Sequence, residues 1–298
     1  MAGISRFRSA EARDDFCRLY NQAVADSPIP LSESDIDTSW GRTHVLAAGD
    51  PSSPPLVAIH GKSFNATSWL SMLPVLAAGH RVTMIDVVGD LTKSVAAKPI
   101  SKASHIVAWL DETLRALEVE RAAFAGMSFG GWMAAQYAMA FPGRVDQLAL
   151  ICPAGLVSSL QLGWLLHAYG ATAVRPTPAG VSAFLDTMAT PAGRQRLRAD
   201  PWRLVREQFI VGTLGFKPAL ISVRPTRCDL RALAAAEFPI MAIIGKQESL
   251  HDGPKMASRL RRQLPAAHIA EIDGANHIVP ADQPQIVERL LVDFLRLP

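Results

Sequence analysis

The sequence predicts an α/β protein in which a mostly parallel central sheet is covered by helices on both faces and carries an inserted helical lid. Three observations support this prediction. Short apolar runs alternate with helical patterns over much of the chain, strand-like runs vanish between about residues 154 and 233, and the alternation then resumes. Strands separated by helical crossovers imply parallel pairing, and ligands of such sheets bind at the carboxyl ends of the strands.

The chain opens with a helical pattern and two short strands. Apolar residues recur at helical spacing among mixed charges over residues 6–26, which predicts an amphipathic helix. Strands are expected at residues 44–48 and 55–60, because a turn-rich segment of glycine, proline and serine separates these runs. The second of these strands ends at His60-Gly61.

The middle of the chain supplies most of the predicted sheet. The apolar run over residues 81–88, closed by Gly89, is typical of a strand buried on both faces. Spacing and turn residues then predict a short helix at 69–77, helices at 104–118 and 130–141, and strands at 122–125 and 145–152. Beyond the lid, the same reasoning predicts strands at 239–245 and 267–272 and helices at 255–264 and 283–295.

These elements divide the chain into an N-terminal helical arm at residues 1–40, a core formed by 41–153 and 234–298, and a helical cap at 154–233. Large apolar side chains lie in the helix-like stretches of the cap. We expect most of them to be buried against the sheet and a few to line an acyl pocket. They are Trp164, Leu165, Leu166, Tyr169, Phe184, Met188, Trp202 and Phe209.

Composition excludes several classes of protein. The net charge of +3 comes from Lys and Arg spread along the chain, so no nucleic-acid partner is expected. The three cysteines lack the paired spacing of zinc ligands or of a disulfide framework. Charges near the N-terminus argue against a secretory signal, and glycines interrupt the most apolar stretch at 122–141, so we expect a cytoplasmic protein without a membrane span.

The strongest motif is Gly126-Met127-Ser128-Phe129-Gly130, which follows a predicted strand and opens a predicted helix. In this context the serine lies on a sharp turn that exposes its hydroxyl, and only glycine fits the crowded positions around it. The helix N-terminus favours negative charge that develops beside the hydroxyl. The alternative interpretation is a glycine-rich turn with an ordinary capping serine.

A serine nucleophile needs a base, and His277 fits that role because it follows the last predicted strand and so lies at the same edge of the sheet as Ser128. The alternative interpretation is an ordinary histidine in a surface loop. His251, His105 and His167 are weaker candidates, because the first lies in the loop expected to hold the acid and the others lie on predicted helices.

The orienting acid is expected between serine and histidine in chain order. Glu248 follows the predicted strand at 239–245 and is our choice, with Asp252 in the same loop as the substitute. The oxyanion hole needs two backbone N–H donors. Phe129 supplies the first, and Lys62 is favoured over Ser63 for the second.

Together these motifs resemble the α/β-hydrolase superfamily over nearly the whole chain after residue 40. The matching segments, in family order, are His60-Gly61 with Trp69 downstream, 86–89 with Lys93-Ser94, 126–131, 141–145, 245–248 and 274–277. The resemblance implies Ser128 as nucleophile, His277 as base and Glu248 as acid, although family members commonly use aspartate in the last role. The loop at 89–94 is also less rich in glycine than is usual. Serine at the elbow argues against the dehalogenase and epoxide hydrolase branches, which have aspartate there.

The predicted function is hydrolysis of a carboxylic ester or thioester of a small, largely apolar molecule through an acyl-enzyme intermediate, with no cofactor or metal required. One alternative is a carbon–carbon bond hydrolase, or a lyase or cyclase, that uses the same Ser–His pair; Trp69 after His60-Gly61 is reminiscent of the carbon–carbon hydrolases. A further alternative is a ligand-binding protein that has lost catalysis. The sequence carries no signal for an oligomeric state.

Overall fold

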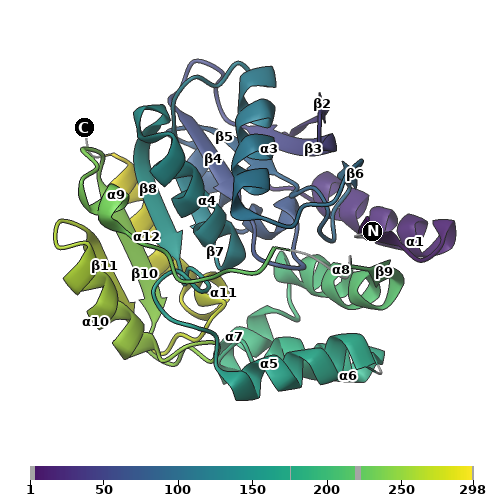
Figure 1. Cartoon of the computed structure of the whole chain (residues 1–298). Helices are drawn as coiled ribbons and strands as arrows, with labels where there is room; N and C mark the ends of the chain where they lie inside the picture. The colour runs from purple at the N-terminus through teal and green to yellow at the C-terminus, as the bar shows by residue number, and fades with distance from the viewer. Residues whose placement is uncertain (1–3, 175, 219–222, 297–298) are drawn as a thin grey trace.

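A mixed nine-stranded sheet forms the centre of the molecule (Figure 1). The computed structural model describes residues 4–174, 176–218 and 223–296. The strand order is β11-β10-β8-β7-β4-β5-β3-β2, with β6 paired to β3. Along this order, the pairs from β11 as far as β5 are all parallel. Strand β3 pairs antiparallel with β2, β5 and β6. The predicted α/β fold with a mostly parallel sheet is therefore confirmed.

The predicted strands are present, with ends that differ by a few residues from the sequence-based bounds. The strands of the sheet are β2 (Ser32–Thr38), β3 (Gly41–Ala48), β4 (Pro55–Ile59), β5 (Arg81–Ile85), β6 (Val95–Ala96), β7 (Ala122–Met127), β8 (Val145–Ile151), β10 (Ile240–Gly245) and β11 (His268–Ile272). Strand β2 was not expected, and it lies within the segment assigned to the arm. Its sequence is polar and mostly exposed because it is the edge strand, so it lacks the apolar alternation that marks a strand.

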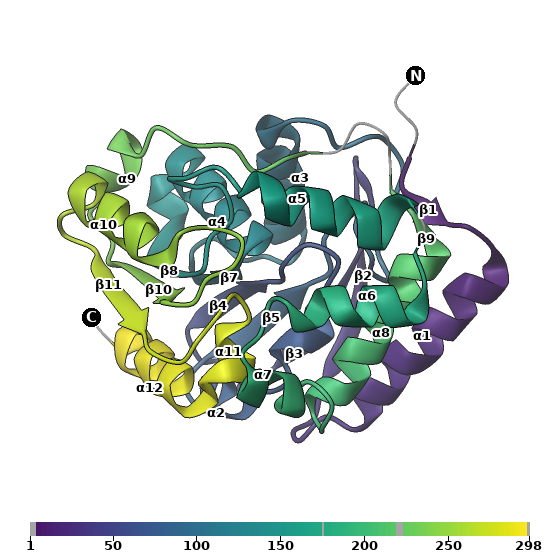
Figure 2. The same ribbon diagram turned by 90° about the horizontal axis from the view of Figure 1, so that it is seen from below.

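Helices cover both faces of the sheet (Figures 1 and 2). One face packs against α3 (Ala103–Ala116), α4 (Phe129–Ala140) and α10 (Gly253–Gln263). The other packs against α1 (Ala10–Ala25), α2 (Leu73–Ala77) and α12 (Pro284–Leu295). Successive residues of a strand point to opposite faces, and in β4 Val57 joins the first core while Leu56 joins the second. This double burial explains why the central strands are continuous apolar runs.

The chain between β8 and β10 is mainly helical. It contains α5 (Leu162–Tyr169), the π-helical turn η3 (Gly170–Val174), α6 (Pro178–Asp186), α7 (Pro191–Arg196), α8 (Trp202–Gly215), β9 (Phe216–Lys217) and α9 (Arg231–Ala234). Helices α5 to α8 gather beside the carboxyl ends of the parallel strands (Figure 2). The shorter elements of the core are η1 (Ala66–Trp69), η2 (Pro142–Arg144) and α11 (Val279–Asp282).

The N-terminal segment contacts this helical region. Strand β1 (Arg6–Phe7) pairs antiparallel with β9, and the amide of Arg8 donates to the carbonyl of Gly215 at 2.8 Å. Helices α1 and α8 approach closely, since a Cβ on Gly215 would lie 2.9 Å from the Cβ of Ala12. None of the helices in the described part of the chain is both long enough and apolar enough to cross a membrane.

Candidate active site

Ser128 lies on a sharp turn between β7 and α4. Its φ of 54° and ψ of −115° fall in a region that residues other than glycine rarely adopt. Three backbone hydrogen bonds hold this conformation. The Ser128 amide donates to Ile151 at 2.8 Å, and its carbonyl accepts from Ala154 at 3.0 Å and from Trp132 at 3.1 Å. The strained serine is thus fixed at the carboxyl edge of the sheet.

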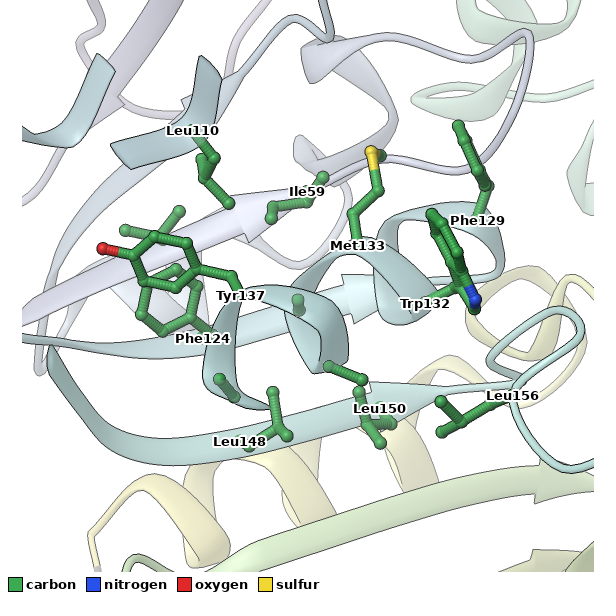
Figure 3. Close-up of a cluster of buried hydrophobic side chains, with 14 of the residues drawn as sticks. Ile59, Leu110, Phe124, Phe129, Trp132, Met133, Tyr137, Leu148, Leu150 and Leu156 are labelled. Atoms are coloured by element: carbon green, nitrogen blue, oxygen red, sulfur yellow. The ribbon is translucent and has the colours of Figure 1, made fainter. Parts of the chain in front are cut away.

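Glycine is required on both sides of the serine. A Cβ on Gly126 would lie 2.4 Å from the carbonyl oxygen of Gly130, and one on Gly130 would lie 2.2 Å from that of Ile59. Both clashes involve backbone atoms, which cannot move aside as a flexible side chain can. Helix α4 therefore starts in contact with the sheet, and its side chains interleave with those of β4, β7 and β8 (Figure 3).

His277 lies in the turn after β11, and its two ring nitrogens face Ser128 and Glu248. Nε2 is 2.8 Å from Oγ of Ser128, and Nδ1 is 2.7 Å from Oε2 of Glu248. Ser128, His277 and Glu248 expose only 8%, 5% and 6% of their surface. In the arrangement that satisfies both contacts, the hydroxyl of Ser128 donates to Nε2 and Nδ1–H donates to the carboxylate.

Glu248 is held in the loop after β10. Its Oε1 accepts a hydrogen bond from the Leu250 amide at 2.7 Å while Oε2 faces the imidazole. Burial alone would raise the pKa of this carboxyl, but the positive charge of the protonated form of His277 and the hydrogen bonds from His277 and Leu250 outweigh burial and lower the pKa. Asp252, the substitute from the sequence, instead caps α10 by accepting from the Lys255 amide at 3.0 Å, and it is exposed.

The two amides assigned to the oxyanion hole donate no hydrogen bond to any other residue that the structure describes. Phe129 is the first residue of α4, where an N–H has no partner within the helix. Lys62 lies in the loop after β4. The amide of Ser63 is already engaged, because it lies 3.2 and 3.3 Å from the two carboxylate oxygens of Asp90. Of these two candidates, the Ser63 amide therefore has a partner among the described residues and the Lys62 amide has none.

The other histidines considered from the sequence have different partners. His251 is buried, with Nδ1 3.1 Å from Oγ of Ser158 and 3.2 Å from the carbonyl of Ser159. His105 lies against the ring of Trp40, and His167 lies against the ring of Phe184.

An apolar cluster connects the cap with the loops of the site. It includes Phe64 from the loop after Lys62, Leu250 from the acid loop and Ile278 beside His277. Of the cap residues expected to be buried, Phe184, Met188, Trp202 and Phe209 belong to this cluster, and the partly buried Trp164 packs against it. Leu165, Leu166 and Tyr169 do not fit that expectation, since they are 40%, 64% and 65% exposed on α5.

Two further residues lie at the site, and the sequence reasoning gave neither of them a role there. Cys152 follows β8 directly, and its buried sulfur lies within 4.8 Å of ligand atoms of Glu248 and His277. Burial raises the pKa of this thiol well above its ordinary value. A metal ion held by these three groups would have to replace the bond between Glu248 and His277.

The second residue, Asn276, precedes His277 in the sequence. Its side chain forms hydrogen bonds to the loop that carries Glu248 and to the backbone of His277.

The chain is similar to known proteins in both sequence and structure. A family model described as the alpha/beta hydrolase fold matches residues 54–284. Carboxylesterase YbfK of Bacillus subtilis (strain 168) is 22% identical over 296 residues, which cover 97% of this chain and 96% of that protein. A protein named uncharacterized carboxylesterase nap, from the same organism, is 24% identical to this chain. The match covers 94% of this chain and 91% of that protein. Among solved structures, naproxen esterase (carboxylesterase NP) from Bacillus subtilis has a TM-score of 0.87 and 25% identity, covering 97% of this chain and 100% of that one.

Proposed function

Because this chain belongs to the α/β-hydrolase fold family, we propose that it is a serine carboxylesterase that acts through an acyl-enzyme on Ser128. The family match spans residues 54–284, which confirms the resemblance seen in the sequence motifs. Membership alone does not give an activity, since one fold can support many reactions. The proposal therefore depends on the site and on the names of the carboxylesterases to which the chain is similar.

The observation that carries the proposal is the continuous chain of contacts from Ser128 through His277 to Glu248, at 2.8 and 2.7 Å. A serine hydroxyl is a weak nucleophile unless a base removes its proton, and the base needs the correct tautomer to do so. The buried carboxylate supplies that tautomer. A capping serine beside a chance histidine would need neither of these contacts.

In the proposed reaction, Oγ of Ser128 attacks the carbonyl carbon of the ester while Nε2 of His277 takes the hydroxyl proton. The carbonyl oxygen becomes an oxyanion, which the amides of Lys62 and Phe129 stabilise. Collapse of this intermediate breaks the bond to the alcohol or thiol, which leaves with the proton from His277. A water molecule then attacks the acyl-serine by the same steps, and the acid is released with Ser128 restored.

The surroundings of the site support a small, largely apolar acyl group. The apolar cluster shared by the cap and the loops of the site includes Phe64, Leu250 and Ile278, which come from the loops that carry Lys62, Glu248 and His277, and this supports a hydrocarbon substrate. Apolar groups gain binding energy from such surfaces in proportion to the area removed from water, about 25 cal/mol per Å². Acyl chains of increasing length should therefore be turned over faster until the available space is filled.

The test is hydrolysis of p-nitrophenyl esters from acetate to laurate by the wild-type protein and by Ser128→Ala. We expect turnover by the wild type with an optimum in chain length. We expect the variant to lose activity by about 10⁶-fold, the scale seen when a triad serine is removed. Equal rates for the two proteins would contradict the assignment of Ser128, and a rate independent of chain length would contradict the apolar acyl site.

A carbon–carbon bond hydrolase with the same Ser–His pair is the second candidate from the sequence. Trp69, the residue that suggested it, is fully buried and belongs to the hydrophobic core on the face of the sheet that α1, α2 and α12 cover. Inertness to the ester series, together with turnover of a vinylogous diketone, would favour that candidate, and tight ligand binding without turnover would favour a binding protein.

A further inference from the structure

The side chain of Asn276 joins three segments that meet at the site. Its Oδ1 accepts hydrogen bonds from the amide of Ser249 at 2.8 Å and from the amide of His277 at 2.7 Å. Its Nδ2 donates to the carbonyl of Thr187 in the cap at 3.0 Å. Asn276 is 9% exposed, so water can replace these bonds only poorly. One amide group thus connects the acid loop, the histidine and the cap.

We propose that Asn276 is a positioning residue that holds His277 in register with the Glu248 loop and couples both to the turn between α6 and α7 of the cap. The proposal rests on the proposed function of the triad. Asn276 does not face Ser128 in any contact that the structure shows, so it acts through the loops that carry the base and the acid.

The orientation of the Asn276 amide follows from its partners. Two backbone N–H groups converge on one side, and only an oxygen can accept from both. The nitrogen must then face the third partner, which is the carbonyl of Thr187. Each end of the amide is therefore matched to its environment. Replacing the amide by a carboxylate of the same shape would keep the oxygen that faces the amides of Ser249 and His277 but would remove the N–H that faces Thr187. The bonds to the loops and the bond to the cap can therefore be tested separately.

Further bonds fix the same turn of the cap against the histidine loop. The amide of Ile278 donates to the carbonyl of Met188 at 3.0 Å. The buried carboxylate of Asp282 accepts from the amide of Asn276 at 2.7 Å and from both the amide and the hydroxyl of Thr190 at 2.8 Å. Residues 276–282 and residues 187–190 are therefore joined by several hydrogen bonds in addition to that of the Asn276 side chain. A shift of the cap turn would be transmitted to the base of the triad.

Catalysis is sensitive to such shifts, because a misplacement of about 1 Å can cost about 100-fold in rate. Loss of the Asn276 side chain should therefore lower kcat more than it raises KM. For Asn276→Ala we expect kcat on p-nitrophenyl butyrate to fall by about 10- to 100-fold, with KM changed by less than about threefold. Asn276→Asp retains an oxygen for the two amides but loses the donor to the cap, so it should recover part of the lost kcat.

A matched control is Gln208→Ala. Gln208 is also a fully buried amide that ties the cap to the core, since its Oε1 accepts from Asn65 at 2.7 Å and from Thr67 at 3.1 Å. It does not contact the loops that carry His277 and Glu248 in any bond that the structure shows. Gln208→Ala should therefore lower the melting temperature while leaving kcat within about twofold of the wild type.

The second readout is independent of any substrate. The Nδ1 proton of His277, shared with Glu248, should give a downfield ¹H NMR signal in wild type and in Gln208→Ala, and it should be broadened or lost in Asn276→Ala. An unchanged signal in Asn276→Ala, or equal losses of kcat in Asn276→Ala and Gln208→Ala, would overturn the positioning role. An inactive wild type with the expected NMR differences would refute only the esterase function.

Discussion

Replacing Glu248 by glutamine keeps the size of the side chain and removes its charge. The carboxylate accepts two hydrogen bonds, one from His277 and one from the Leu250 amide, both at 2.7 Å. Glutamine has one carbonyl oxygen, so only one of these donors keeps its acceptor. If the oxygen stays with the Leu250 amide, the NH₂ group faces Nδ1 and requires it to be unprotonated. Nε2 then carries the proton and cannot accept another from Ser128.

The expected cost is large because the wrong tautomer removes the base. Exchanging the acid of a serine triad for its amide lowers kcat by about 10⁴-fold. At 1.36 kcal/mol for each tenfold change, this corresponds to about 5.4 kcal/mol of transition-state stabilisation. Glu248→Asp keeps the charge but withdraws the carboxylate by about 1.5 Å, one carbon–carbon bond. The contact of 2.7 Å then exceeds the range of a hydrogen bond, so we expect a loss of about 100-fold.

The assay is kcat/KM on p-nitrophenyl butyrate for both Glu248 variants, with Asp252→Asn as the matched control. Asp252 caps α10, and asparagine caps helices about equally well, so the control should retain its activity within about twofold. More than a tenth of wild-type activity in Glu248→Gln would refute the tautomer argument. A comparable loss in Asp252→Asn would move the role of the acid to that residue.

Two further substitutions test the packing of the elbow and the pH dependence of stability. Gly130→Ala should lower the free energy of unfolding by more than about 3 kcal/mol in urea titrations, because the new Cβ would lie 2.2 Å from the carbonyl oxygen of Ile59. The control is Gly143→Ala, because Gly143 has open space where a Cβ would be added. Equal free energies of unfolding for the two variants would contradict the clash. Burial lowers the pKa of His251, so the folded state resists its protonation and stability should fall as the pH drops below about 6.5, the value in the unfolded chain. His251→Asn should flatten this decline between pH 7.5 and 5.5, and an unchanged slope would show that other groups cause it.

The sheet could be predicted from the sequence because its central strands are buried on both faces, which leaves continuous apolar runs such as residues 145–152. The elbow could be predicted because the glycines at 126 and 130 are needed for a local backbone turn. Strand β2 could not, since an edge strand satisfies its polar side chains in water. The exposed α5 was misjudged for a related reason, because its apolar side chains contribute hydrophobicity to the sequence without contributing to a core.

The residues expected to carry chemistry share a property that local patterns can reveal. Each lies at the end of a strand or in the loop after it, and the topology brings these strand ends to one edge of the sheet. Asn276, by contrast, is bonded to Thr187, which is distant in the sequence and belongs to the cap. Side-chain hydrogen bonds to a backbone carbonyl place no demand on the residue type that supplies the carbonyl. The sequence of the cap turn therefore contains no sign of the contact, and only the folded chain shows it.

The length of the Glu248 side chain fits its proposed role as the acid, because the loop after β10 turns tightly. The amide of Glu248 donates to the carbonyl of Gly245 at 3.2 Å, and the amide of Gln247 donates to that of Ala275 at 2.8 Å, so the loop stays bound to the end of the sheet. A Cβ on Gly253 would lie only 3.2 Å from the Cβ of Glu248, which shows that the following helix closes on the same turn. The backbone is thus held back by hydrogen bonds, and the extra methylene of glutamate spans the remaining distance to His277. An aspartate at this position would need the loop to give up these bonds, which is why we expect Glu248→Asp to fail as a replacement.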